Sequence, residues 1–377
     1  MTEISDKKPV VRLIASDKNW IEGEAVRQLD KTGELPGMRF IVGMPDIHPG
    51  KGHPVGAAFV SEGLFYPHLV GNDVGCGMGL WKTDLRQKKI KRDRWTDRLS
   101  GLESVWDGDR TDWLAQDGVA PTLSDLGLGT IGGGNHFAEL QVVEKVMDQD
   151  AFDSLGLDKA YLVLLVHSGS RGLGDSLFRS HASEYGAGGL QEGSEAAAKY
   201  LSGYEHAVKW AVSNRSLIAS RFLSALGADG ERVVDICHNM LVQTVMDNRT
   251  CWLHRKGAVP SDNGPVIIAG TRGSLSYLVS PHGDQEMNAY SLAHGAGRKW
   301  KRSDTKKRLS RKYTAKSLTH TRLGGRVICD DKFLLYEEAP QAYKNIDIVV
   351  KDLLDAGLIR VISTFCPLIT YKMRKAS

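Results

Sequence analysis

Short apolar runs alternate with glycine-rich segments along this chain, a pattern that predicts strands ending in tight turns. The apolar runs predict strands at Tyr161 to Val166, Val266 to Ala269 and Leu358 to Ile362. Apolar residues at helical spacing predict helices at Glu192 to Leu226, interrupted near Gly203, and at Ile346 to Asp355. No fixed-period repeat or Pro/Ser-rich linker divides the chain. We therefore expect an α+β fold, with one mixed α/β domain over residues 1–377 and its sites on strand-end loops.

The composition is that of a soluble globular protein and excludes a disordered one, since 41% of the 377 residues are hydrophobic and 25% are charged. The net charge of +4 is too small to indicate a partner. The N-terminus has no apolar segment after its basic residues, and no apolar run approaches the roughly 20 residues of a membrane helix. Five scattered cysteines argue against a disulfide framework. We expect a cytoplasmic protein with no membrane partner.

One segment departs from this balance, because residues 298–312 hold nine Lys/Arg and a single acid, Asp304. One interpretation is a solvated surface loop, which is the usual meaning of a charge run. The other is a contact with the phosphates of RNA, in which Trp300 stacks on a base. The segment follows directly after His294, and this position favours RNA.

Five glycine- or turn-rich segments each carry a potential metal ligand or nucleophile, at 71–78, 132–139, 166–172, 236–239 and 293–298. A single His in such a turn is structural about as often as it is functional, so the prediction rests on the repetition. One carboxylate, one thiolate and three imidazoles exceed the needs of one tetrahedral zinc. A two-metal site with a bridging thiolate would use all five, and such sites suit phosphoryl chemistry. The five candidate metal ligands are Asp73, Cys76, His136, His167 and His238.

His294 differs from the other histidines because Gly-Ala-Gly and the basic segment follow it. A neutral imidazole in such a loop can attack phosphorus, or it can donate a hydrogen bond to a phosphate. The spacing does not decide between these roles. The residues alone indicate a metal-dependent phosphoryl-transfer enzyme that acts on a phosphate-rich substrate.

Taken together, these segments resemble the RtcB family of RNA ligases. The resemblance rests on their order and spacing over nearly the whole chain, and it implies an RtcB-type fold with a central metal and nucleotide site. The segments that carry it are 44–52, 71–78, 132–139, 166–174, His238-Asn239, 291–298, 338–347 and Lys372.

The resemblance implies an enzyme that uses GTP and two Mn²⁺ ions. One ion would be bound by Asp73, Cys76 and His136, and the other by Cys76, His167 and His238. His294 would be the catalytic residue that carries the guanylate to an RNA 3′ end. The substrate would be RNA with a 3′-phosphate or 2′,3′-cyclic phosphate, joined to a 5′-hydroxyl end in splicing or repair. An activating protein is a further implied partner.

The resemblance also implies a nucleotide pocket, in which Glu139 would accept hydrogen bonds from guanine. Asp46 would lie near the RNA end, and Tyr343 would stack on guanine or belong to the core. Arg272 stands where the family has Met in a Pro-Gly-Ser-Met-Gly loop, so it would contact a phosphate or alter the preference for RNA ends. The pocket residues are Asn135, His136, Glu139, His238, Asn239, Ala269, Gly270, Thr271, Arg272, Ser276, His294, Gly295, Ala296, Gly297 and Lys372.

Two other functions share part of this pattern. A metal-dependent phosphoesterase acting on RNA terminal phosphates would use the same metal ligands but would not need His294. A non-catalytic RNA-binding module would depend on the basic segment and not on Cys76. The sequence leaves two substrates open, tRNA halves and a damaged RNA.

Overall fold

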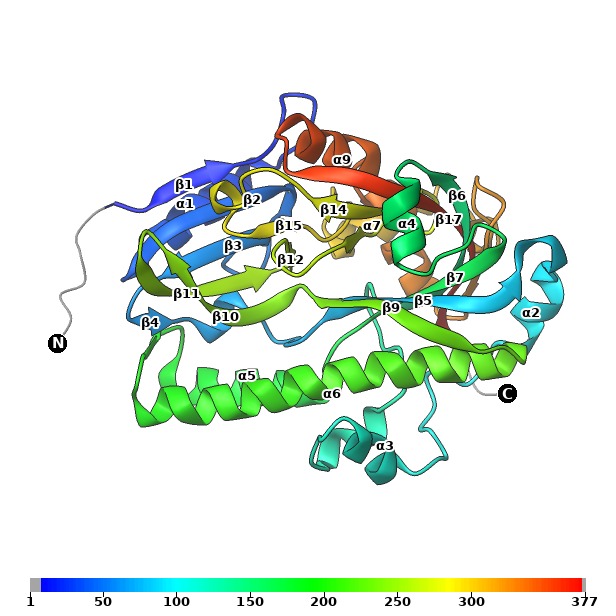
Figure 1. Ribbon diagram of the computed structural model, residues 1–377, viewed down its shortest axis with the longest axis horizontal. Coiled ribbons are helices and arrows are strands. Elements are labelled where there is room, and N and C mark those ends of the chain that lie inside the picture. The colour runs from blue at the N-terminus through cyan, green and yellow to red at the C-terminus, as the bar shows by residue number, and fades with distance from the viewer. Residues whose placement is uncertain (1–7, 375–377) are drawn as a thin grey trace.

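The computed structural model describes residues 8–374, and the prediction that no signal peptide is present falls partly on residues 1–7, outside that range. Two sheets lie next to each other through the middle of the molecule, with a long helix along one side (Figure 1). Within the described residues, no helix combines the length and the apolar character needed to cross a bilayer. The arrangement confirms the mixed α/β class.

The five-stranded sheet runs in the order β1 (Val10–Leu13), β2 (Met38–His48), β3 (Val55–Ser61), β11 (Arg249–Lys256) and β10 (Asn239–Met246). The eight-stranded sheet runs in the order β13 (Val266–Ile268), β14 (Ser276–Pro281), β17 (Ile359–Met373), β6 (Phe137–Val146), β7 (Tyr161–Ser168), β5 (Gly77–Arg86) and β9 (Gly230–Cys237), and β16 (Arg326–Cys329) pairs with β17. The short pairs are β4 (Leu64–Phe65) with β8 (Leu190–Gln191), and β12 (Ala258–Pro260) with β15 (Ser291–Ala293).

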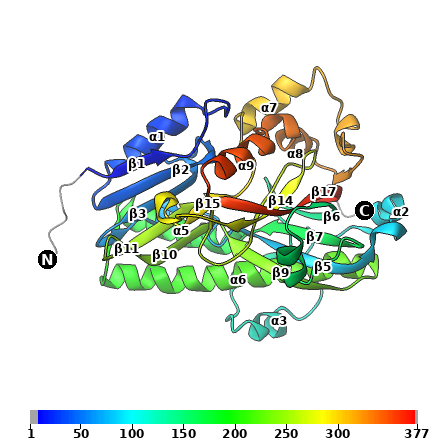
Figure 2. The ribbon, with the colours of Figure 1, turned by 45° about the horizontal axis from the view of Figure 1, so that its top comes forward.

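Helices cover both sides of the sheets. The helices are α1 (Gly23–Gly33), α2 (Arg92–Arg98), α3 (Arg110–Gln116), α4 (Gln149–Ser154), α5 (Gly172–Tyr185), α6 (Glu195–Leu226), α7 (Arg302–Leu309), α8 (Lys332–Glu337) and α9 (Ile346–Asp355). Figure 2 shows α6 on one side and α1, α7, α8 and α9 on the other. Helix α6 packs its apolar face against β5, β7 and β9, burying Ile218, Phe222 and Leu223. A buried side chain of this kind contributes about 2 kcal/mol, which anchors α6 to the sheet.

The predicted interruption of the long helix near Gly203 is wrong, because α6 is continuous. A Cβ atom at Gly203 would lie 2.8 Å from Cδ1 of Leu177 in α5. The glycine therefore permits close packing of two helices, at the ~1 kcal/mol that glycine costs in a helix. The predicted start at Glu192 is also three residues early. The helix begins at Glu195 because the side chain of Ser194 caps it, accepting a hydrogen bond from the backbone N–H of Ala197 at 3.1 Å.

The other predicted elements are found, with one difference in length. The helix at Ile346–Asp355 is confirmed, and the strands at 161–166 and 266–269 correspond to β7 and β13. The last strand was predicted to end at Ile362, but β17 continues to Met373. It passes through Pro367, where the register with β6 shifts, and such irregularities are where a strand tolerates proline. The basic segment at 298–312 is not simply a loop, since it contains α7 packed on α8.

Candidate active site

Several strand ends meet at one edge of the eight-stranded sheet, and the candidate metal ligands lie there. Strand β7 lies between β5 and β6 and is antiparallel to both, so the starts of β5 and β6 lie beside the end of β7. This places Cys76, His136 and His167 next to one another. His238 is the single residue between β9 and β10, which belong to different sheets. The cluster thus lies where the two sheets join.

The ligand atoms of this cluster are close enough to share metal ions. Sγ of Cys76 lies 3.4 Å from Nε2 of His136 and 3.3 Å from Nε2 of His167. Nε2 of His136 lies 2.9 Å from Oδ2 of Asp73, and Nε2 of His167 lies 3.4 Å from Nε2 of His238. Two ligands of one ion at bond lengths of about 2.0–2.3 Å lie no more than about 4.6 Å apart. Cys76 at the centre has the position that a bridging thiolate requires.

The surroundings orient the imidazoles toward the cluster. Nδ1 of His136 lies 3.2 Å from the carbonyl oxygen of Ile131, and Nδ1 of His167 lies 3.2 Å from that of Asn135. Each Nδ1 donates its hydrogen to a carbonyl, which leaves Nε2 free for a metal. Asp73 Oδ1 is buried and has no hydrogen-bond partner among the described residues, as expected of a metal ligand. The donor set therefore fits divalent cations.

Burial sets the protonation states that metal binding needs. It holds the pKa values of His167 and His238 well below the usual range, so both imidazoles are neutral. Burial raises the pKa of the Cys76 thiol, and the nearby Asp73 carboxylate raises it further. Burial would also raise the pKa of Asp73, but its interactions with His136, Cys76 and Arg171 together lower it. The thiol would lose its proton only when a cation binds.

His294 follows β15 and lies beside the cluster, its ring centroid 4.7 Å from that of His238. Nδ1 of His294 lies 2.7 Å from Oδ2 of Asp46, a fully buried carboxylate in β2. The same oxygen accepts a hydrogen bond from the backbone N–H of His294 at 3.3 Å. Asp46 thus holds the backbone of His294 and places its carboxylate beside Nδ1, and Nε2 is the ring nitrogen left for chemistry.

A buried arginine from α6 connects the loops of the cluster. Arg215 donates hydrogen bonds to the carbonyl oxygens of Gly75 and Ser168, at 2.8 and 2.9 Å. It also forms a two-point ion pair with Asp235 in β9, with N–O distances of 2.9 and 2.5 Å. Burial alone would lower the pKa of Arg215, but the carboxylate of Asp235 raises it. One side chain therefore ties together the residues next to Cys76 and His167 and the strand that leads to His238.

A cavity of about 1010 Å³ opens beside this cluster. It is lined by all of the predicted metal and nucleotide residues except His136 and Ser276. His136 lies behind Cys76, and Ser276 supports the wall by accepting a hydrogen bond from the backbone N–H of Gly270 at 3.1 Å. The structure thus gathers the predicted residues around one cavity, while their individual roles remain predictions.

Glu139 and Lys372 also line this cavity, and both are buried. Glu139 accepts a hydrogen bond from Gln141 at 2.6 Å and another from the hydroxyl of Thr370. Burial raises the pKa of Glu139, and it lowers the pKa of Lys372 to about 8. Lys372 is held in β17 with its Nζ 4.0 Å from Oε2 of Glu338. Its place near the end of the chain gave no sign of this burial.

Arg272 and Tyr343 also border the cavity, but each already has partners. Arg272 is buried, and one of its guanidinium nitrogens donates to the carbonyl oxygen of Leu335 at 2.8 Å. The guanidinium of Arg298 lies over the Tyr343 ring, 5.0 Å from its centroid. The Tyr343 hydroxyl donates to Glu338. One face of Tyr343 is therefore covered by a cation.

The sequence interpretation missed two supporting residues. Arg215 resembles any basic residue of an amphipathic helix, and no local signal shows that it is buried. Arg171 adopts a positive φ of 57° and places a guanidinium nitrogen 3.4 Å from Nδ1 of His136. Positive φ is uncommon for a residue with a side chain, and the Gly169-Ser170-Arg171-Gly172 turn was the available signal.

Comparisons with known proteins agree with this geometry. The family model described as tRNA-splicing ligase RtcB matches residues 28–111 and 116–373. RNA-splicing ligase RtcB2 of Escherichia coli is 49% identical over 362 residues, covering 95% of this chain and 94% of that protein. The tRNA-splicing ligase RtcB of Archaeoglobus fulgidus is 29% identical over 447 residues, covering 92% of this chain and 91% of that protein. RNA-splicing ligase RtcB homolog 1 of Entamoeba dispar is 28% identical over 437 residues, covering 92% of this chain and 81% of that protein.

Proposed function

Because this chain belongs to the RtcB family, we propose that it is a GTP-dependent RNA ligase that uses manganese. It joins an RNA 3′-phosphate or 2′,3′-cyclic phosphate end to a 5′-hydroxyl end, in RNA splicing or repair. The observation that carries the proposal is the Asp46–His294 pair, 2.7 Å long, beside the Cys-His cluster. A phosphoesterase would need the cluster but not a further histidine beside a carboxylate of its own.

The geometry of the pair supports a first step. The Asp46 carboxylate lies beside Nδ1 of His294, so Nε2 is the nitrogen whose lone pair attacks the α-phosphorus of GTP. The N–P bond forms as the bond to the bridging oxygen breaks, and pyrophosphate leaves with that electron pair. Asp46 stabilises the positive charge that develops on the imidazole. The product is a guanylate on Nε2.

Two transfers complete the ligation. An oxygen of the RNA 3′-phosphate attacks the guanylate phosphorus, and the N–P bond breaks to return His294 to its neutral form. The 5′-hydroxyl oxygen then attacks the RNA 3′-phosphorus, loses its proton and displaces GMP. A cyclic phosphate would first be opened by water to the 3′-phosphate. Activation by GMP turns a poor leaving group into a good one.

The cluster would hold two Mn²⁺ ions, one through Asp73, Cys76 and His136 and the other through Cys76, His167 and His238. Bound cations would neutralise phosphate charge and align the reacting groups. The mixed set of carboxylate, thiolate and neutral imidazoles supports this assignment.

Guanine selection is proposed for the buried end of the cavity. Glu139 is an acceptor with its carboxylate oxygens already oriented by Gln141 and Thr370. Such a carboxylate can accept hydrogen bonds from the N–H groups of guanine, which adenine does not present in the same pattern. Lys372 and the backbone of residues 269–272 and 295–297 complete the pocket.

The test is incubation with GTP labelled at the α-phosphate, in Mn²⁺. We expect a labelled protein adduct that is labile to acid and stable to alkali, and that is absent in His294→Ala. RNA joining by His294→Ala, or the absence of any adduct in the native protein, would contradict the proposal. Retained hydrolysis of terminal phosphates in His294→Ala, without joining in either protein, would favour the phosphoesterase.

Three further parts of the proposal concern the setting of the enzyme. RNA is the substrate, and either tRNA halves or a damaged RNA supplies the ends. An activating protein partner assists turnover, and the protein works in the cytoplasm. Ligation of matched tRNA halves and of nicked ribosomal RNA fragments, with and without cell extract, distinguishes the substrates and the need for a partner.

A further inference from the structure

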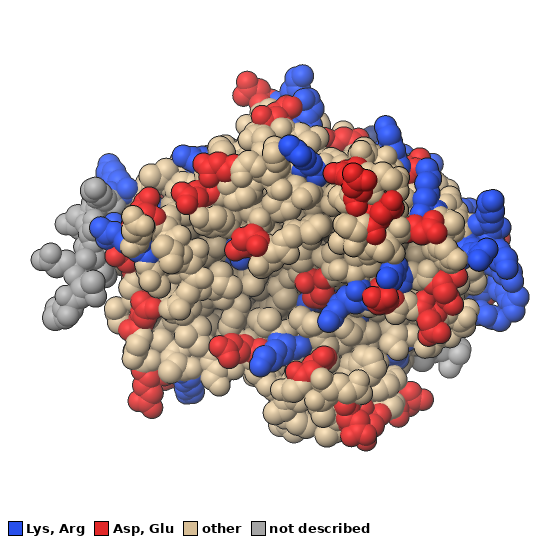
Figure 3. All heavy atoms as spheres, viewed as in Figure 1, with Lys and Arg blue, Asp and Glu red and all other residues tan. Residues whose placement is uncertain are grey.

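A second basic segment lies far from the candidate active site. Residues 86–98 contain seven Lys/Arg and two Asp, a net charge of +5 that exceeds the +4 of the whole chain. The segment runs from the end of β5 through α2. Figure 3 shows Lys and Arg side chains gathered at the end of the molecule where Figure 1 places α2. The charge is therefore concentrated and local.

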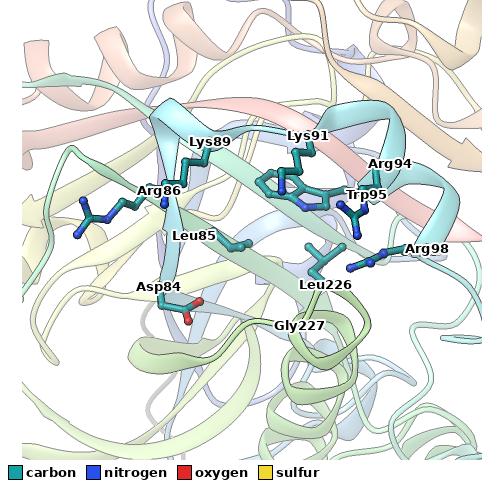
Figure 4. Close-up of a pocket in the computed structure, with 10 residues that line it drawn as sticks. All are labelled: Asp84, Leu85, Arg86, Lys89, Lys91, Arg94, Trp95, Arg98, Leu226 and Gly227. Atoms are coloured by element: carbon teal, nitrogen blue, oxygen red, sulfur yellow. The ribbon is translucent and has the colours of Figure 1, made fainter.

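This segment encloses a hollow of about 310 Å³, here called the α2 pocket. Its floor is apolar, formed by Leu85, Trp95 and Leu226, and its one acidic residue is the exposed Asp84. In Figure 4, Arg94 and Arg98 extend from α2 on the same side of the Trp95 ring, whereas Arg86 points away. Four exposed cations remain around the hollow, here called the pocket cations: Lys89, Lys91, Arg94 and Arg98.

The pocket cations are not neutralised by the part of the protein that the structure describes. Within residues 8–374, none of them forms an ion pair within 4.0 Å. By contrast, Arg326 nearby is paired with Asp93 at 3.4 Å. Lys91, which precedes α2, and Arg94 and Arg98 within it are three and four positions apart, so the three lie on one side of the helix, where like charges repel one another. An anionic ligand with several charges would relieve this repulsion.

The chemistry of the pocket favours a phosphate backbone over other anions. Several cations at fixed spacing on a rigid element match phosphates repeated along a chain. Trp95 is buried in the core, so it cannot stack on a base. The expected contact is therefore to backbone phosphates, which position a nucleic acid without selecting its sequence.

The distance from the active site fits the body of an RNA and not its ends. Strand β5 begins next to Cys76 and reaches the α2 pocket after 10 residues. At ~3.3 Å per residue the two sites are about 30 Å apart. An RNA whose end occupies the central cavity reaches the α2 pocket only if it is longer than that.

We propose that the α2 pocket binds backbone phosphates of the substrate RNA, at a distance from the ends that are joined. The proposal rests on the proposed function, because it takes RNA as the substrate. It adds that the protein holds long or structured RNA through a second contact that short end fragments do not reach.

The experiment compares two charge-reversal variants of the full chain. The first, here called the α2 variant, is Lys91→Glu/Arg94→Glu/Arg98→Glu. The control reverses three exposed lysines elsewhere, Lys18→Glu/Lys31→Glu/Lys209→Glu. Binding of a hairpin RNA whose stem is well over about 30 Å long, and of a pair of short end fragments, is measured against salt. We expect the α2 variant to bind the long RNA at least 10-fold more weakly, with a salt slope smaller by about 2–3. Binding of the short fragments and formation of the His294 adduct should match the control.

Other outcomes overturn the proposal. The proposal is wrong if the α2 variant binds the long RNA as tightly as the native protein does. It is also wrong if the variant loses the same affinity for short and long RNA, because that result would locate the effect in the central cavity. A preserved RNA affinity with lost binding to phosphatidylserine vesicles would assign the pocket to a membrane surface instead. The milder Lys91→Gln/Arg94→Gln/Arg98→Gln variant, checked by thermal unfolding, replaces the triple Glu variant if that one does not fold. Because RNA binding is read separately from the guanylate adduct, failure of the proposed function leaves this test intact.

Discussion

Oδ2 of Asp46 lies 2.7 Å from Nδ1 of His294, although 248 positions separate the two residues in the chain. The carboxylate comes from β2 of the five-stranded sheet, and the imidazole follows β15. Asp46 is fully buried, so its interaction with His294 is weakly screened by water. The pair therefore places a buried carboxylate beside the imidazole of the proposed nucleophile.

Asp46→Asn should slow guanylation of His294 while preserving the fold. The amide has almost the same volume, but it removes the charge that stabilises the developing imidazolium. We expect the rate of adduct formation from labelled GTP to fall on the order of 10²-fold or more. Asp17→Asn, an exposed carboxylate, is the matched control and should react at the native rate. Equal rates in Asp46→Asn and the native protein would show that Asp46 has no part in the chemistry.

Cys76→Ala should remove manganese binding at both positions of the cluster, because Sγ lies beside an imidazole of each proposed ligand set, His136 and His167. Loss of groups around a metal commonly costs 10- to 100-fold in affinity, and loss of a shared ligand should cost at least that. Electron paramagnetic resonance of free Mn²⁺ during titration measures the bound fraction. Cys251→Ala, a buried cysteine of β11, should bind as the native protein does. Chelation of the metal should abolish joining, and addition of Mn²⁺ should restore it.

The sequence predicted the elements and residues whose signals are local. Helix Ile346–Asp355 has a clear amphipathic period and a cap at Asn345, and its bounds agree with the prediction. The candidate ligands were found because each follows or precedes a strand at a turn. The Gly203 interruption was wrongly predicted because helix-helix packing, which is non-local, decided the role of that glycine. The second basic segment was overlooked because Asp93 and Asp97 interrupt it, and only the fold separates these acids from the pocket cations.

Arg215→Met should destabilise the whole fold, because it leaves the carboxylate of Asp235 without its partner. Breaking a buried ion pair from one side costs about 3–5 kcal/mol, and the carbonyls of Gly75 and Ser168 also lose a donor. Urea unfolding measures the change in the free energy of unfolding. Arg232→Met on the exposed part of β9 should change it by less than about 0.5 kcal/mol. Adding Asp235→Leu to Arg215→Met should recover part of the loss, and a loss as small as that of Arg232→Met would contradict the assigned role.

The affinity for GTP should fall as the pH rises through about 8, because Lys372 then loses its charge. Burial lowers the pKa of Lys372 to about 8 from an ordinary value of 10.5, although Glu338 opposes the shift. The folded state thus disfavours the ammonium form: this cost to stability is fully present below about pH 8 and is relieved as the pH rises toward 10.5. Nucleotide binding has the opposite dependence, since an ammonium group, not an amine, attracts the anionic ligand.

The measurement is calorimetric titration of GTP between about pH 7 and pH 9.5, in the native protein and in Lys372→Met. The variant should bind more weakly at the low end of this range and should lack the fall near pH 8. Lys351→Met, an exposed lysine paired with Asp355, should keep the native profile. If Lys372→Met retained the same fall, the titrating group would lie elsewhere, and the buried ammonium would have no part in holding the nucleotide.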